Sequence, residues 1–127
     1  MDRLYIKESE YCPEIILDAD ENLISFIGQS YPENTFEFYK PVLNWIQKYS
    51  ERSPKKIKVI LELVYLNSSS FKAFFDVIDL LDEARKKYNS SIDIEWIYDK
   101  DNDIALETGE DFQDDFKALK IKLVEKK

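Results

Sequence analysis

A long apolar strand that runs directly into a cluster of hydroxyl side chains is the feature that most constrains this chain. Residues Lys56–Leu66 alternate between the two faces of a predicted strand, and both faces carry apolar side chains. Such a strand is typical of the centre of a sheet, so we expect both of its faces to be at least partly covered. The strand ends at Asn67–Ser70, which reads Asn-Ser-Ser-Ser, and an amphipathic helix is predicted over about Phe71–Lys87.

The remaining apolar pattern places strands and helices in a regular order. Further strands are predicted at Leu4–Ile6, Glu14–Asp18, Leu23–Gly28, Ile92–Tyr98 and Leu119–Leu123. Two more helices are predicted, one from Asn34 to about Tyr49 and one over about Ile104–Phe116. Pro41 lies inside the first of them, so it either kinks that helix or moves its start to a later residue.

The resulting order, β-β-β-α-β-α-β-α-β, predicts an α/β fold. Strands that alternate with helices form crossover units with parallel pairing, whereas the opening hairpin is antiparallel. We therefore expect a mixed sheet of five or six strands with three main helices packed against it. At 127 residues the chain, 1–127, is expected to form a single domain.

Composition excludes several classes of function. The formal charge of −8, from 18 basic and 26 acidic residues, argues against nucleic-acid binding, which needs clustered Lys and Arg. The chain has no histidine and only two glycines, which removes the usual general base and any phosphate-cradling glycine loop. Its one cysteine, Cys12, forms neither an internal disulfide nor a cysteine-rich zinc site. We expect no catalytic residue, no cofactor and no metal.

The sequence also carries no targeting signal that we recognise. The N-terminal residues lack the apolar run of a signal peptide. No stretch approaches the roughly 20 apolar residues that span a bilayer. We therefore expect a cytoplasmic protein with no direct membrane insertion.

An acidic turn offers the one pattern that resembles a metal site. Asp99, Asp101, Asp103 and Glu110 have the spacing of calcium ligands in a helix–loop–helix site, but Ile104 stands where the turn needs glycine. A turn that caps the third helix is therefore the favoured interpretation. An enzyme with facing carboxylates is a further alternative, although the sequence shows no such pair.

The serines after the central strand have two interpretations. Serine is favoured at helix starts, so one of the three is expected to cap the helix. The other interpretation is a phosphorylation switch, because a spare hydroxyl at a helix N-terminus is well placed for an anion. Phosphate adds nearly two negative charges and three acceptor oxygens, which the helix N-terminus and Lys72 would hold.

Several segments resemble the SiaC family of regulatory phosphoproteins. The most specific is Tyr31–Pro41, which reads YPENTFEFYKP. Leu4–Ile6 with Pro13–Ile15, Tyr65–Ser70 and Ile94–Asp99 agree with it. The resemblance covers essentially the whole chain, and it implies a fold like that of anti-sigma-factor antagonists, which also carry a switch hydroxyl at a strand–helix junction.

The resemblance implies a bacterial, non-enzymatic adaptor. It implies that a protein kinase phosphorylates Ser68, that a phosphatase reverses the reaction, and that the unphosphorylated form binds and activates a diguanylate cyclase. The cyclase is then expected to raise cyclic di-GMP and promote aggregation or biofilm growth. Asn67, Ser69, Ser70 and Lys72 then form the switch loop around Ser68. The Tyr31–Lys40 segment is either part of the docking face or core. The alternative is a constitutive interaction or structural subunit with no phosphoswitch.

Overall fold

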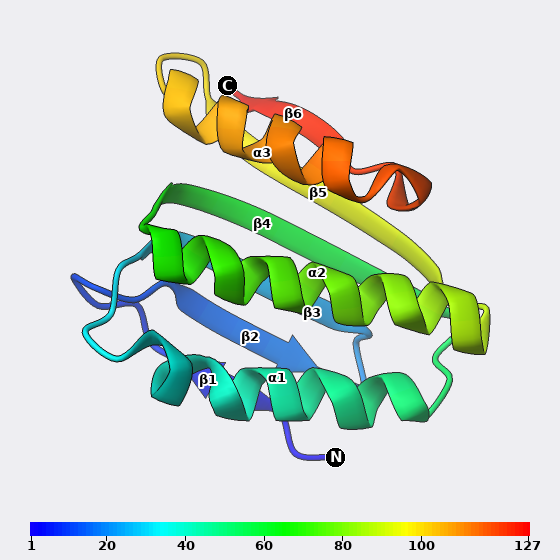
Figure 1. Ribbon diagram of the computed structural model, residues 1–127. Coiled ribbons are helices and arrows are strands. Elements are labelled where there is room, and N and C mark those ends of the chain that lie inside the picture. The colour runs from blue at the N-terminus through cyan, green and yellow to red at the C-terminus, as the bar shows by residue number, and fades with distance from the viewer.

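The computed structural model describes residues 1–127 and contains one sheet whose six strands lie side by side in chain order (Figure 1). The strands are β1 (Leu4–Ile6), β2 (Glu14–Asp18), β3 (Leu23–Ser30), β4 (Lys56–Leu66), β5 (Ser91–Asp99) and β6 (Lys122–Lys126). The pairs β1–β2 and β2–β3 are antiparallel, and β3 to β6 are parallel. The predicted mixed α/β sheet with an antiparallel hairpin is confirmed.

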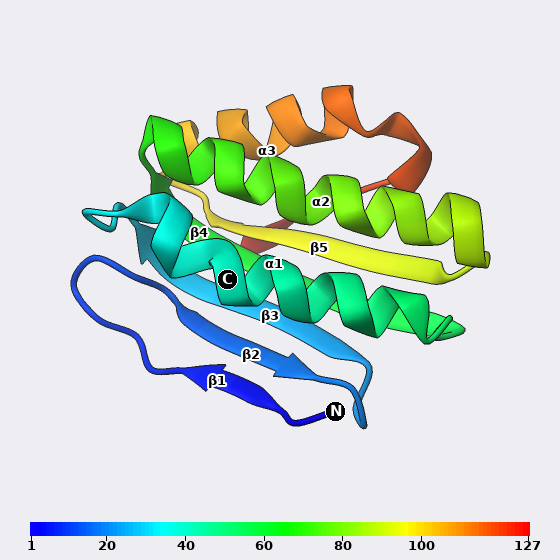
Figure 2. The ribbon, with the colours of Figure 1, turned by 60° about the horizontal axis from the view of Figure 1, so that its bottom comes forward.

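Three α-helices and one 3-10 turn connect the parallel strands. They are α1 (Thr35–Glu51), α2 (Ser68–Tyr88), α3 (Asp103–Asp115) and η1 (Lys117–Leu119). All three α-helices lie on the same face of the sheet, as the two views show (Figures 1 and 2). This follows from right-handed crossovers that always step in the same direction along the sheet. The helices also begin at the same end, where the parallel strands finish.

The two faces of β4 have different environments. Its helix-side residues have at most 2% of their surface exposed, and they are Ile57, Val59, Leu61 and Leu63. The opposite face carries Lys58, Ile60 and Glu62, which are half-buried under neighbouring sheet side chains, and no helix covers it. The predictions of a central strand and of partial cover on both faces are confirmed, although every crossover helix lies on one side.

The structure corrects two predicted boundaries and settles a third. Helix α2 begins at Ser68, three residues before the predicted Phe71, so the serines form its first turn. The segment predicted as a strand from Leu119 instead starts with η1, and Lys120 adopts positive φ before β6 begins at Lys122. Helix α1 begins at Thr35 and continues through the exposed Pro41, so the alternative of a later start is wrong.

Two close approaches fix the helices and the site relative to the sheet. A Cβ on Gly109 of α3 would lie 2.5 Å from Trp96 Cδ1, so α3 packs unusually close to β5. Between β3 and β4 the register shifts after Gly28, where β4 has the extra residue Val64, and Ser30 then lies beside Leu66 of β4. The shift thereby brings the end of β3 next to the start of α2. No helix in the structure is long and apolar enough to cross a membrane.

Candidate functional site

The candidate site is the turn between β4 and α2, which we call the switch turn (Asn67–Ser70). Backbone hydrogen bonds hold it, because Asn67 N–H donates to Ser30 O at 3.1 Å and Phe71 N–H donates to Asn67 O at 2.8 Å. The side-chain oxygen of Asn67 accepts the Ser70 N–H at 2.9 Å. Asn67 is therefore the N-cap of α2. The prediction that a serine caps this helix is wrong.

The three serines of the switch turn lie in three different environments. Ser70 is fully buried, and its hydroxyl hydrogen-bonds Ser30 at 2.7 Å. Ser69 is exposed, but its hydroxyl bonds Thr35 Oγ1 at 2.7 Å and Asn67 Oδ1 at 3.3 Å. Ser68 is exposed, and its hydroxyl alone has no hydrogen-bond partner in the chain. Of the three serine hydroxyls, only that of Ser68 is therefore free of hydrogen bonds to the chain.

A buried chain of hydroxyls joins the switch turn to α1 and β3. Ser30 Oγ lies 2.6 Å from Tyr39 OH and 2.7 Å from Ser70 Oγ, and none of the three residues is more than 1% exposed. Burial raises the pKa of the Tyr39 phenol well above its usual range, and the hydrogen bond from Ser30 only partly offsets this. Tyr39 is therefore neutral at physiological pH, and the chain ties three elements together without a buried charge.

A second link between α1 and α2 lies at the surface and was not predicted. Thr35, the first residue of α1, meets Ser69 across the two helix starts. The only feature of the sequence that hints at this link is that both helices begin with asparagine followed by a hydroxyl residue. Asn34 caps α1 through the Glu37 N–H at 3.3 Å, as Asn67 caps α2. Asn34, from which this helix was predicted to run, is therefore its N-cap.

Lys72 does not point its charge toward the start of α2. Its ammonium group bonds Asp76 Oδ1 at 2.6 Å, one turn further along the helix, and its side chain is 71% exposed. It also lies 5.8 Å from the centre of the Phe75 ring. Lys72 is one turn after Ser68 and therefore shares its side of the helix. To reach a group on Ser68, its ammonium has to leave Asp76.

Most of the exposed large apolar side chains lie at the end of the molecule that holds the switch turn. Seven large hydrophobic residues are exposed, and five of them belong to the end of the sheet where the helices begin: Tyr11, Phe36, Val64, Tyr65 and Ile104. Asn102 holds the start of α3 against this end, because its amide donates to Val64 O at 3.0 Å. We call these five residues the apolar rim. Monomer surfaces rarely expose large apolar side chains together without a partner.

The Tyr31–Lys40 segment contributes to both the core and this surface. Tyr39 is 1% exposed and belongs to the core, whereas Phe36 is 70% exposed. Tyr31 packs edge-on between Tyr11 and Tyr65, with ring centres 5.3 and 6.0 Å away. The interpretation of this segment as core is confirmed for Tyr39, whereas its interpretation as a docking face stays a prediction.

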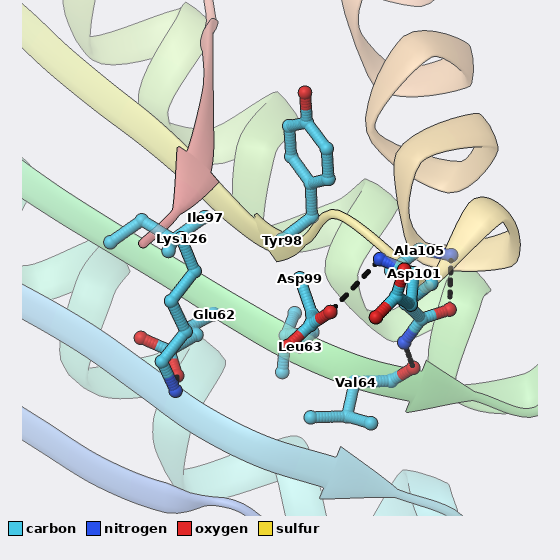
Figure 3. Close-up of a pocket in the computed structure, with 10 residues that line it drawn as sticks. Glu62, Leu63, Val64, Ile97, Tyr98, Asp99, Asp101, Ala105 and Lys126 are labelled. Atoms are coloured by element: carbon cyan, nitrogen blue, oxygen red, sulfur yellow. Dashed lines mark hydrogen bonds and ion pairs between the residues drawn. The ribbon is translucent and has the colours of Figure 1, made fainter.

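Two clefts lie near the helix starts, and only one reaches the switch turn. A cleft of about 210 Å³ lies between α1 and α2, and its lining includes Thr35, Phe36, Ser69 and Lys72. A larger cleft of about 350 Å³ lies at the ends of β4 and β5, where Glu62 and Lys126 form an ion pair at 3.0 Å (Figure 3). None of the predicted switch residues lines the larger cleft.

The acidic turn before α3 is organised by hydrogen bonds to its own backbone. Asp99 Oδ1 accepts the Asp101 N–H at 2.9 Å, and Asn102 Oδ1 accepts the Ala105 N–H at 3.0 Å (Figure 3). Asn102 is the N-cap of α3, and Asp103 supplies an acid in the first helical turn. The interpretation of this segment as a capping turn is confirmed.

Comparison with models of known protein families shows the family to which the chain belongs. The model of the SiaC family, described as regulatory phosphoproteins, matches residues 6–126. The chain belongs to the SiaC family. An uncharacterised protein of Pseudomonas aeruginosa (strain UCBPP-PA14) is 34% identical over 115 residues, which is 91% of this chain and 90% of that protein. The predicted family resemblance is confirmed.

Solved structures of SiaC share the fold. SiaC of Pseudomonas aeruginosa is 31% identical, with a TM-score of 0.84 over 98% of this chain and 97% of that one. A crystal structure of the diguanylate cyclase SiaD in complex with its activator SiaC, also from Pseudomonas aeruginosa, matches with the same TM-score of 0.84 at 31% identity. That match covers 96% of this chain and 97% of the other. The relative is thus the activator of a diguanylate cyclase.

Proposed function

We propose that this member of the SiaC family is a cytoplasmic, non-enzymatic adaptor controlled by phosphorylation of Ser68. In its unphosphorylated form it binds and activates a diguanylate cyclase, and the resulting cyclic di-GMP promotes biofilm growth. A protein kinase adds the phosphate and switches the adaptor off, and a phosphatase restores the active form. The observation that carries the proposal is the free, exposed Ser68 hydroxyl at the start of α2.

The local chemistry favours Ser68 over its two neighbours as acceptor. Phosphorylation of Ser70 would require the opening of the core, because Ser70 has no exposed surface. Phosphorylation of Ser69 would first break its bond to Thr35. Phosphorylation of Ser68 requires neither the opening of the core nor the loss of a hydrogen bond. The first turn of α2 also has no acidic residue that would repel the phosphate. The unpaired N–H groups and dipole of a helix N-terminus favour an added negative charge.

The apolar rim supports a protein partner at this end of the molecule. Aromatic residues dominate the energetics of protein interfaces, and Tyr11, Phe36 and Tyr65 are about half or more exposed there. A phosphate on Ser68 places a strongly hydrated dianion beside this apolar surface. Burying such a charge without a partner is costly, so a partner that fits the neutral surface dissociates.

Two measurements test the proposal. Phosphosite mapping by mass spectrometry, on the protein isolated from its own cells, is expected to find phosphate on Ser68. Pull-down from the same cells is then expected to recover a diguanylate cyclase with the unsubstituted chain and with Ser68→Ala. Ser68→Asp is expected to bind that cyclase at least about tenfold more weakly, because a tenfold change needs only about 1.4 kcal/mol.

Ser91→Asp is the matched control, because Ser91 is an exposed serine at the opposite end of the sheet, where β5 begins. It adds the same charge and is expected to leave cyclase binding unchanged. If Ser68→Ala and Ser68→Asp bind the cyclase equally well, the chain is a constitutive interaction subunit and the switch is rejected. The switch is also rejected if mass spectrometry covers the Ser68 peptide well and never finds it phosphorylated under any growth condition.

A further inference from the structure

We propose that Thr35 is the positioning residue through which helix α1 senses the phosphorylation state of Ser68. The inference rests on the proposed function, because it concerns what a phosphate on Ser68 does inside the chain. Its basis is a continuous set of hydrogen bonds from the cap of α2 to the first residue of α1. These bonds cross between two helices whose starts lie side by side (Figure 1).

The cap oxygen of Asn67 is the centre of this set. It accepts the Ser70 N–H at 2.9 Å and the Ser69 hydroxyl at 3.3 Å. Ser69 Oγ in turn lies 2.7 Å from Thr35 Oγ1. Each hydroxyl has one proton to donate. Since the Ser69 proton goes to Asn67, the Thr35 proton goes to Ser69, and the longer 3.5 Å contact of Thr35 with Pro32 O is the weaker alternative.

A phosphate on Ser68 competes for the donors that Asn67 now holds. The Ser70 N–H has no partner in the helix backbone and donates to Asn67 Oδ1, and a charged acceptor forms a stronger hydrogen bond with it than this neutral amide oxygen does. Displacement of the Asn67 oxygen removes the acceptor of Ser69, whose proton then turns to the phosphate. Because Thr35 donates to Ser69 Oγ, it loses this partner when the Ser69 side chain rotates to bring its hydroxyl to the phosphate, and the start of α1 is then no longer fixed.

The effect is confined to the first turn of α1. Further along the helix, the Tyr39 hydroxyl bonds Ser30, which in turn bonds the Ser70 hydroxyl. None of these three hydroxyls bonds the Asn67 side chain, which contacts Ser70 only through its backbone N–H. The first intrahelical bond of α1, from Phe38 N–H to Asn34 O at 3.1 Å, spans Thr35. Thr35 and Phe36 also line the cleft between α1 and α2, so loosening this turn alters the surface beside Ser68.

The test measures amide hydrogen exchange by NMR on the full chain, with phosphoserine incorporated genetically at position 68 so that no kinase is needed. Exchange of the Phe38 amide is expected to be about fivefold faster in the phosphorylated chain, the factor expected for the loss of one hydrogen bond. In Thr35→Val the Phe38 amide is expected to exchange fast already, with no further acceleration by phosphoserine. Thr35→Ser restores the hydroxyl and is expected to restore the response.

Thr108→Val is the matched control, because Thr108 is the only other threonine and its hydroxyl bonds Ile104 O within α3. It is expected to keep the full response of Phe38. Ser69→Ala cuts the same link from the other helix and is expected to behave like Thr35→Val. The inference is overturned if phosphoserine leaves Phe38 exchange unchanged, or accelerates it equally in Thr35→Val. Absence of Ser68 phosphate in cells would reject the proposed function, whereas this readout would still report on Thr35.

Discussion

The starts of α2 and α3 have the same cap but different first turns. In both helices an asparagine oxygen accepts the N–H three residues later, at 2.9 Å for Asn67 and 3.0 Å for Asn102. The residue after the cap is Ser68 in α2 and Asp103 in α3. The start of α3 therefore has a permanent negative charge at the place where α2 has a neutral hydroxyl.

This difference separates a structural helix start from a switchable one. Asp103 gives the N-terminal dipole of α3 its complementary charge at all times. Helix α2 has no acid in its first turn, so its dipole is complemented only when a charge is added. The neighbours differ too, because Asn67 also binds the Ser69 hydroxyl, whereas Asn102 binds the backbone of β4. A charge added at Ser68 can therefore alter hydrogen bonds that extend to α1, whereas the start of α3 is bonded to the sheet.

The largest expected effect is on the packing that holds α3 in place. Gly109→Ala is expected to lower the free energy of unfolding by about 1–3 kcal/mol, since the new Cβ overlaps Trp96 and the helix has to shift. Denaturant unfolding measures this loss. Thr108→Ala, at the neighbouring and less buried position, is the control and is expected to cost less than about 1 kcal/mol. An unchanged stability of Gly109→Ala would show that α3 is not tightly held.

Removal of each cap tests whether the two helix starts differ in what they hold. Asn67→Ala and Asn102→Ala are each expected to lower the free energy of unfolding by about 1 kcal/mol, because each leaves a helix N–H without its acceptor. The two substitutions are expected to differ in their effect on helix α1. Only Asn67→Ala should accelerate amide exchange of Phe38 in α1, which NMR measures. Equal acceleration by Asn102→Ala would mean that the two helix starts are not distinct.

The smallest expected effect comes from exchanging the residues after the caps. Ser68→Asp is expected to raise the free energy of unfolding by about 0.3–1 kcal/mol, and Asp103→Ser to lower it by a similar amount. Both effects should shrink in high salt, which screens an exposed charge from the helix dipole. Thermal unfolding at low and high salt measures them. A loss of stability in Ser68→Asp would contradict a start of α2 that favours negative charge.

The order of strands and helices could be predicted because it depends on local periodicity. The bounds of β4 are those predicted, since its apolar alternation is long and uninterrupted. The start of α2 was predicted three residues late, because apolar periodicity first appears at Phe71 while the first turn consists of serines. The start of β6 was predicted too early, because Leu119 and Ile121 continue the apolar alternation through a turn that only positive φ at Lys120 reveals.

The candidate site was predicted in part. Asn67 and the three serines were identified as one turn, and the structure brings them together at the start of α2. Their different roles were not predictable, because they depend on contacts with Ser30 and Thr35, which lie 40 and 34 residues away from their serine partners. No local pattern marks such pairs. The role of Ser68 as phosphoacceptor and the extent of the domain, 1–127, stay predictions.

By itself the sequence determined the α/β order, the central strand and the presence of a hydroxyl turn after it, because strand and helix periodicity are local properties of the chain. Tertiary structure decided which hydroxyl is free. The parallel pairing of β3 with β4, with its register shift at Val64, sets Ser30 beside Ser70, and the adjacent start of α1 sets Thr35 beside Ser69. Ser68 alone has neither neighbour, since burial and hydrogen bonding of a side chain depend on which distant segments fold against it.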